Sequence, residues 1–346
     1  MPSNDYRQSW ARVKELAVAV AIDMVWDQWV SLGSLAGPVR RLDPTWMVDP
    51  EALVLMSELR VGDEPRLRDQ LDWWAAVGTP QTSIQRMRTF AGQAPEIWSP
   101  ALERFATRAS AAGHRSWSRL AKPDEFPDAK PTRLKGPATL VLRGPSTFLV
   151  RLRAAYGVAT KTDCMSYLVG LRGGLATVSD IARALGYTET AVRDAVGDML
   201  VAGVVQDTGE RPARFMVPNP TRSPIKVEAI PAPKPSRGFT GLHRVAEPVV
   251  SYSTDSDPDS PRWIHWPALF RLLAGAHESA VRAMEDPGSE FSQASRARDL
   301  VESHRWVLAV HGIPLPDLAS YPGPRFVDAL LTILGSIERW AWGPAK

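Results

Sequence analysis

The chain has 346 residues, of which 44% are hydrophobic and 23% charged, and its formal net charge is +3. This composition is ordinary for a soluble globular protein, and the length predicts two or three domains. No run of about 18 uncharged apolar residues occurs, and the N-terminus lacks a basic segment followed by an apolar one. The sequence therefore predicts neither a membrane span nor a secretory signal. The single cysteine, Cys164, excludes an intramolecular disulfide, which fits a cytoplasmic location.

Residues 1–121 are expected to form an N-terminal helical domain. The apolar periodicity predicts a long amphipathic helix over residues 9–32. Asp49 followed by Pro50 is a typical helix start, with an N-cap and then proline at the first helical position. The segment 49–90 could form a small helical bundle or a degenerate second helix-turn-helix. Helices are expected at about residues 50–60, 65–77, 83–90 and 99–112.

Two proline-containing segments interrupt the rest of the chain. Residues 122–145 are interpreted as a basic, Pro-rich connector. Residues 218–262 hold nine prolines and are expected to be an extended arm or a linker, because proline breaks helices. Residues 263–346 are expected to form a C-terminal helical domain. Its helices are predicted at residues 267–284, 290–311 and 324–342.

Thirteen tryptophans occur, and none lies between Trp117 and Trp263. This distribution favours two tryptophan-rich helical cores, one at each end of the chain. The alternative is that the N- and C-terminal helices contact each other, or form an oligomer or partner interface. Because adjacent residues cannot face the same side of a helix, Trp73 and Trp74 are expected to meet different surroundings.

The central segment, residues 146–217, carries a helix-turn-helix pattern. Gly186 separates two short amphipathic stretches and tolerates the positive φ that a tight turn between helices often needs. Thr177 or Ser179 can cap the first helix, and Thr188 can cap the second. The second helix is marked by apolar residues at i, i+3, i+4 and i+7, namely Val192, Ala195, Val196 and Met199.

Residues 203–217 then predict a strand, a turn at residues 207–210 and a second strand. This block of about 60 residues resembles the winged-helix repressors of the MarR, ArsR and GntR kind, in particular in the segment Leu-Val-Ala-Gly-Val-Val at 200–205. The resemblance implies a mainly α fold with a central winged helix-turn-helix and a small β-hairpin wing, flanked by N- and C-terminal helical domains. It also implies double-stranded DNA as a partner.

In such a fold the second helix usually enters the major groove, and its outward residues reach base edges. Arg193 is the best candidate, because its guanidinium can bridge O6 and N7 of guanine. Arg211 and Arg214 of the predicted hairpin suit phosphates or the minor groove. The complete set of residues expected to contact DNA is Thr188, Glu189, Thr190, Arg193, Arg211, Arg214, Lys161, Arg151 and Arg153.

The charge of this segment opposes DNA binding. Residues 162–217 contain five arginines and seven acidic residues, which gives a local net charge of −2. Phosphate neutralisation supplies most non-specific affinity, so we expect the basic flanks with Arg151, Arg153 and Lys161 to provide it.

No metal-ligand spacing, glycine-rich phosphate loop or nucleophile motif occurs, so no catalysis, metal or cofactor is expected. The sequence therefore predicts a bacterial, sequence-specific transcriptional regulator, a repressor, that acts as a homodimer because paired half-sites add specificity. One alternative is an antitoxin-like autoregulator that also binds a partner protein. The chain is similar to type IV antitoxins of the AbiEi kind only in general layout. The other alternative is a protein-interaction scaffold that does not bind DNA.

Overall fold

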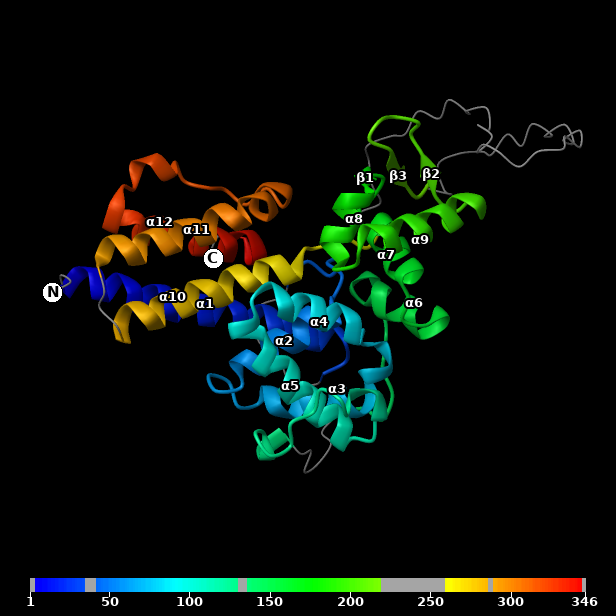
Figure 1. Cartoon of the computed structure of the whole chain (residues 1–346), viewed down its shortest axis with the longest axis horizontal. Coiled ribbons are helices and arrows are strands. Elements are labelled where there is room, and N and C mark those ends of the chain that lie inside the picture. The colour runs from blue at the N-terminus through cyan, green and yellow to red at the C-terminus, as the bar shows by residue number, and fades with distance from the viewer. Residues whose placement is uncertain (1–3, 35–41, 130–135, 219–258, 286–288, 344–346) are drawn as a thin grey trace, which may run out of the picture.

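The computed structural model describes residues 4–34, 42–129, 136–218, 259–285 and 289–343. They form a mainly helical structure in two parts, with one small sheet (Figure 1). The larger part, the helical body, consists of α1 (Asn4–Ser31), α2 (Pro50–Arg60), α3 (Leu67–Val77), α4 (Ile84–Gln93), α5 (Pro95–Ala111), α10 (Trp266–Glu285), α11 (Glu290–Val310) and α12 (Phe326–Trp342). The smaller part, the α6–β3 unit, consists of α6 (Phe148–Tyr156), α7 (Thr160–Gly170), β1 (Ala176–Thr177), α8 (Val178–Leu185), α9 (Glu189–Val201), β2 (Gln206–Asp207) and β3 (Arg214–Met216).

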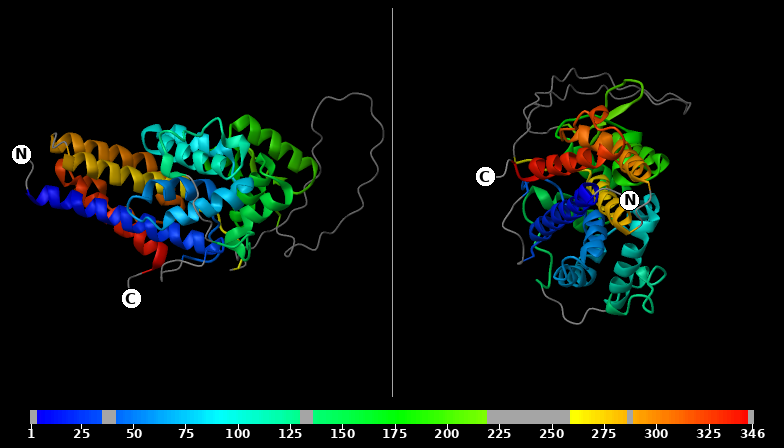
Figure 2. Two further views of the ribbon diagram at one scale, coloured as in Figure 1. Left: turned by 90° about the horizontal axis from the view of Figure 1, so that it is seen from below. Right: turned by 90° about the vertical axis from the view of Figure 1, so that its left-hand side faces the viewer.

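The two ends of the chain share one hydrophobic core. Figures 1 and 2 show α1, α10, α11 and α12 side by side, with α2–α5 between them and the α6–β3 unit. Val20 and Met24 of α1 are buried in the same cluster as Leu269 and Leu273 of α10. The expected separation into N- and C-terminal helical domains is therefore corrected. The N- and C-terminal helices contact each other directly in this core, which is the alternative that the tryptophan distribution left open.

Local signals set the boundaries of the helices in the body. The Asp49 side chain accepts a hydrogen bond from the Ala52 amide at 3.2 Å and so caps α2, as predicted. Helix α5 begins at Pro95, about one turn before the predicted start. Proline is tolerated there because the first amide of a helix has no partner within the helix. Pro100, which was expected to begin the helix, lies inside it.

The adjacent Trp73 and Trp74 meet different surroundings, as expected. The Trp73 indole N–H donates to the carbonyl of Pro137 at 2.8 Å, in the segment that follows the helical body. The Trp74 indole N–H donates to Thr82 Oγ1 at 2.9 Å within the body. Both rings contact Trp29 edge to face, which is a favourable aromatic geometry. Trp73 therefore links the 136–147 segment to the core of the helical body.

Capping residues define the two helices of the α6–β3 unit that follow β1. Thr177 and Asp180 form a reciprocal capping box at the start of α8, and the Thr188 hydroxyl accepts from the Ala191 amide at the start of α9. Gly186 ends α8 with φ 72°. A Cβ at this position would lie 2.8 Å from the ring of Phe90, so glycine is required by conformation and by space. The predicted caps and turn are confirmed.

The sheet has the order β1-β3-β2, and both pairings are antiparallel. Phe215 of β3 faces Ala176 of β1 on one side and Asp207 of β2 on the other. The Gly209 amide donates to Asp207 Oδ1 at 2.9 Å and stabilises the turn between β2 and β3. The predicted strand–turn–strand at 203–217 is thus present. The inner face of this unit is a second hydrophobic core of α7, α8, α9 and β3 side chains.

Two segments from outside the α6–β3 unit complete its core. Met47, which precedes α2, and Trp263, which precedes α10, are buried within it. The Met47 amide donates to the Arg262 carbonyl at 2.8 Å, and the Trp263 amide donates to the Gly170 carbonyl at 2.9 Å. Three segments of the chain, around Met47, Gly170 and Trp263, therefore meet at one place, which we call the junction. Most of the predicted 218–262 arm, residues 219–258, lies outside the described residues.

Candidate nucleic-acid interface

Helix α9 presents one face to solvent and buries the other. Val192, Ala195, Val196 and Met199 lie in the core of the unit, as the periodicity predicted. Thr190, Arg193 and Asp194 lie on the exposed side. The side chain of Arg193 is 63% exposed and projects from the second turn of the helix. The exposed residues of α9 include one cation, Arg193, and three acids, Glu189, Asp194 and Asp198, so the exposed side of this helix is net acidic.

The exposed cations of this region mostly lie beside carboxylates. Arg193 Nη2 is 3.8 Å from Glu189 Oε2, one helical turn away. The hairpin residue Arg214 places Nε 3.8 Å from Glu210 Oε2. Both partners of each pair are exposed, and such surface pairs contribute only about 0–1 kcal/mol. An incoming phosphate or base can therefore replace either carboxylate at little cost.

Lys161 at the start of α7 is also paired, with Nζ 2.5 Å from Asp198 Oδ2 on α9. Arg211 and Arg151 are exposed, and neither forms an ion pair with the residues that the structure describes. Thr188 is exposed, but its hydroxyl oxygen already accepts the capping hydrogen bond of α9. Of the nine expected contact residues, eight therefore lie on the surface of the α6–β3 unit.

Arg153 is the exception, and its expected contact with phosphate is wrong. Its guanidinium is fully buried: Nε and Nη2 donate to the two carboxylate oxygens of Asp163 at 2.8 and 2.7 Å. Nη1 donates to Glu51 Oε1 at 2.6 Å and to the Gln81 carbonyl at 2.8 Å. Every donor direction is occupied by the interior of the protein, so DNA has no access to this side chain.

Arg153 belongs to a buried ionic cluster that joins the two parts of the molecule. Arg86 of α4 lies beside Arg153, pairs with Asp49 and Glu51, and donates Nε to the Leu185 carbonyl at the end of α8 at 2.7 Å. The cluster also receives Tyr187, from the turn before α9, whose hydroxyl donates to Asp163 Oδ2 at 2.9 Å. The turn between α8 and α9 is thereby fixed to α2 and α4.

The electrostatics of this cluster follow from burial and from the balance of charge. Burial raises the pKa of Glu51, although Arg153 and Arg86 oppose the shift. Burial also acts to raise the pKa of Asp163, but Arg153 reverses this, and the pKa of Asp163 is lowered. Tyr187 stays neutral because burial raises the pKa of its hydroxyl. Asp163 is therefore ionised near neutral pH.

The sequence around Arg153 carries a signal for its burial. Leu149, Val150 and Arg153 are the buried residues of α6, and their spacing places them on one face of the helix. Arg153 is thus a charged residue on an apolar face, and Asp163 follows ten positions later in an apolar stretch. This pattern indicates a buried ion pair.

Other chemistry is scarce in the part of the chain that the structure describes. Within those residues, no group of three or more His, Cys, Asp or Glu side chains is arranged to hold a metal ion. Cys164 is buried, and burial raises the pKa of its thiol to about 12, so it is a core residue rather than a nucleophile. None of the described helices combines the length and apolar character that a bilayer crossing requires.

Comparisons of the chain with protein-family models, with curated proteins and with solved structures find no match.

Proposed function

We propose that the α6–β3 unit is a winged helix that binds double-stranded DNA, and that the protein is a sequence-specific transcriptional repressor. The observation that supports this most directly is the exposure of α9, with Arg193 projecting from its second turn. The two capped helices α8 and α9, followed by the antiparallel strands β2 and β3, support this proposal.

The dimensions of α9 suit the major groove. It has 13 residues and so a length of about 20 Å, and a B-DNA major groove about 12 Å wide admits one helix. In this docking mode the N-terminal residues of the helix reach the bases. Thr190 and Arg193 occupy that position, while Arg211 and Arg214 on the hairpin would lie near phosphates or the minor groove. A dimer would place two such helices on paired half-sites.

A second candidate function is protein binding through the same helix, as in an antitoxin-like autoregulator or a scaffold. The net acidic exposed side of α9 favours it, because DNA binding draws most of its affinity from positive charge. Val201 at the end of α9 is 87% exposed, and Val204 after it is 41% exposed. These two valines give a protein partner a small apolar surface at the end of α9.

A fluorescence-anisotropy titration distinguishes the two candidates. The full-length protein is titrated against a labelled duplex from the region upstream of its own gene and against a scrambled duplex, each at two salt concentrations. A preference for the upstream duplex that persists at the higher salt supports a specific regulator. No binding to either duplex at the lower salt would reject DNA binding and favour the protein-binding candidate.

A further inference from the structure

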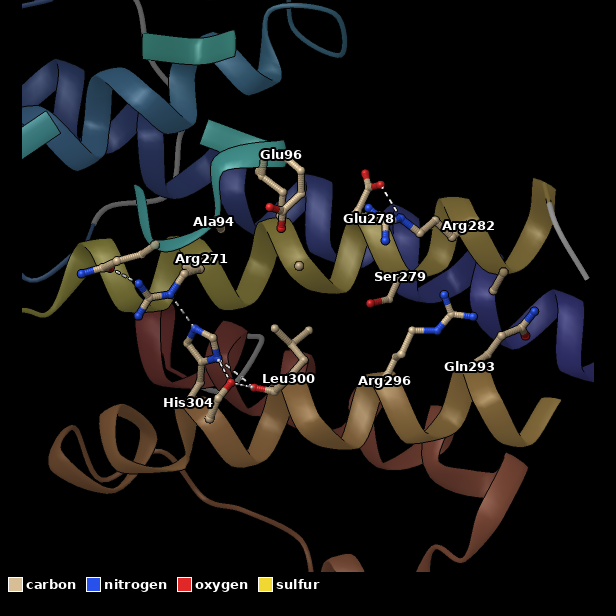
Figure 3. A pocket seen from close by; sticks show the side chains of 15 residues that line it. Ala94, Glu96, Arg271, Glu278, Ser279, Arg282, Gln293, Arg296, Leu300 and His304 are labelled. Atoms are coloured by element: carbon tan, nitrogen blue, oxygen red, sulfur yellow. Dashed lines mark hydrogen bonds and ion pairs between the residues drawn. The ribbon is translucent and has the colours of Figure 1, made fainter. Parts of the chain in front are cut away.

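A groove of about 590 Å³ runs between α10 and α11 and is closed at one end by the junction of α4 and α5 (Figure 3). Gly275 of α10 lies opposite Leu300 of α11, and a Cβ at position 275 would lie 2.6 Å from Leu300 Cδ1. The glycine therefore makes room for Leu300, whose side chain, with Ala94 and Ile97, gives the groove apolar lining. Nothing in the proposed DNA interface uses this groove.

Arg271 lies at one end of the groove, beside His304 (Figure 3). Its Nε donates to His304 Nε2 at 3.0 Å, and its Nη1 donates to the side-chain carbonyl of Gln93. Among the described residues no carboxylate lies within ion-pair distance of it. Burial lowers the pKa of this guanidinium. Arg271 is thus a partly buried cation whose observed hydrogen-bond partners are neutral groups.

The protonation of His304 is fixed by its surroundings. Its Nδ1 lies 2.8 Å from the Leu300 carbonyl, which can only accept, so Nδ1 carries the proton. Nε2 then accepts from Arg271 and the ring is neutral. Burial lowers the pKa of His304 to about 4, so the ring stays neutral near pH 7. His304 orients the guanidinium but does not compensate its charge.

The other charged residues of the groove leave a positive excess. Arg282 is paired with Glu278 at 2.8 Å, which neutralises both. Among the described residues, the hydrogen bonds of Arg296 go to Ser292 alone, at 3.4 Å. Glu96 lies exposed at the rim. The lining therefore has three arginines against two carboxylates.

We propose that this groove binds a small organic carboxylate with an apolar body. Five N–H donors are available on a guanidinium, and His304 and Gln93 use two of those of Arg271. The remaining donors can bind a carboxylate, and charge-assisted hydrogen bonds of this kind are the strong ones. The apolar body lies against Ile97 and Leu300, which gives the ligand buried area that inorganic phosphate lacks.

The test is isothermal titration calorimetry of the full-length protein with 2-naphthoate, its neutral isostere 2-naphthamide and inorganic phosphate, without DNA. Naphthoate is expected to bind at least tenfold more tightly than either of the others. Arg271→Gln keeps a polar side chain beside His304 and is expected to weaken naphthoate at least tenfold while leaving naphthamide unchanged. Arg305→Gln is the control, because Arg305 is an exposed α11 residue paired with Glu302 outside the groove.

The melting curve of Arg271→Gln, followed by circular dichroism, establishes that this variant is folded. Failure of the wild-type protein to bind naphthoate at millimolar concentration would overturn the proposal. Equal affinity for naphthoate and naphthamide, or unchanged naphthoate affinity in folded Arg271→Gln, would also overturn it. All titrations are made in the absence of DNA, so the result is independent of whether α9 binds DNA.

Discussion

Glu51 of α2 and Arg153 of α6 are both fully buried, and an oxygen of one lies 2.6 Å from a nitrogen of the other, although 102 positions separate them in the chain. This ion pair crosses the boundary between the helical body and the α6–β3 unit. Asp163 and Arg86 complete the cluster on either side. The α6–β3 unit is therefore held on the body by charges that have no access to water as well as by apolar contacts.

Replacing Arg153 should strongly destabilise the protein. Arg153→Met leaves Glu51 and Asp163 buried with less compensating charge, and removal of one partner of a buried pair costs about 3–5 kcal/mol. The free energy of unfolding, measured by urea denaturation, should fall by that amount. Arg151→Met, two positions away and exposed, is the control and should stay within about 0.5 kcal/mol of the wild type. Similar stabilities of the two variants would contradict the buried cluster.

Arg193→Ala should reduce discrimination between DNA sequences. A bidentate contact to guanine contributes about 1–3 kcal/mol, and loss of the exposed pair with Glu189 should cost the folded protein little. The ratio of affinities for the upstream and the scrambled duplex should therefore fall while the melting temperature is unchanged. An unaltered ratio would show that α9 does not dock with Arg193 against base edges.

Arg211→Ala and Arg214→Ala should weaken binding to both duplexes by similar factors. Each removes a hairpin cation that we place near phosphate, so the slope of log K against log salt should become shallower by about one per residue. Arg305→Ala on α11 serves as a charge-matched control and should leave the slope unchanged. A loss confined to the upstream duplex would instead indicate that the hairpin reads bases.

The buried pair of His265 and His311 should make stability depend on pH. The His265 amide donates to His311 Nε2 at 3.1 Å, and burial lowers the pKa of these two histidines to about 4 and about 3. Below the unfolded pKa of about 6.5 the unfolded chain binds protons that the folded protein does not. Stability should therefore fall as the pH drops from about 6.5 to 4, by up to about 1.4 kcal/mol per pH unit for each such histidine.

The variant His311→Gln keeps a hydrogen-bond acceptor for the His265 amide but cannot titrate. Urea denaturation at pH 7, 6 and 5 should give a shallower loss of stability than in the wild type. The carboxylates are the same in both proteins, so a difference between the two slopes reports on His311. Identical slopes for the two proteins would mean that His311 is not the buried neutral group that the structure shows.

The local features of this fold were predictable from the sequence, and the long-range ones were not. The cap at Asp49, the turn at Gly186 and the exposed position of Arg193 follow from residue type and periodicity, because each depends on neighbours within one or two helical turns. The pairing of Arg153 with Glu51 depends on how α6 docks on α2, and no local pattern encodes that.

The shared core and the groove also depend on long-range contacts, so they could not be predicted from the sequence. The tryptophan distribution allowed the N- and C-terminal helices to meet, but whether α1 packs against α10 is decided by the complementarity of two surfaces far apart in the chain. The groove beside Arg271 requires Gln93 and His304 to converge on one guanidinium from different helices. In the sequence these residues are three separate polar positions with no shared spacing.

The hydrogen bonds of Met47 and Trp263 at the junction have a consequence for the integrity of the chain. Residues before position 219 and residues after position 258 are joined there by backbone hydrogen bonds, and α1 and α10 share one core. A protease cut within residues 219–258 would therefore sever a covalent link without separating the products. Two bands would appear under denaturing conditions, while a single particle would remain under native ones.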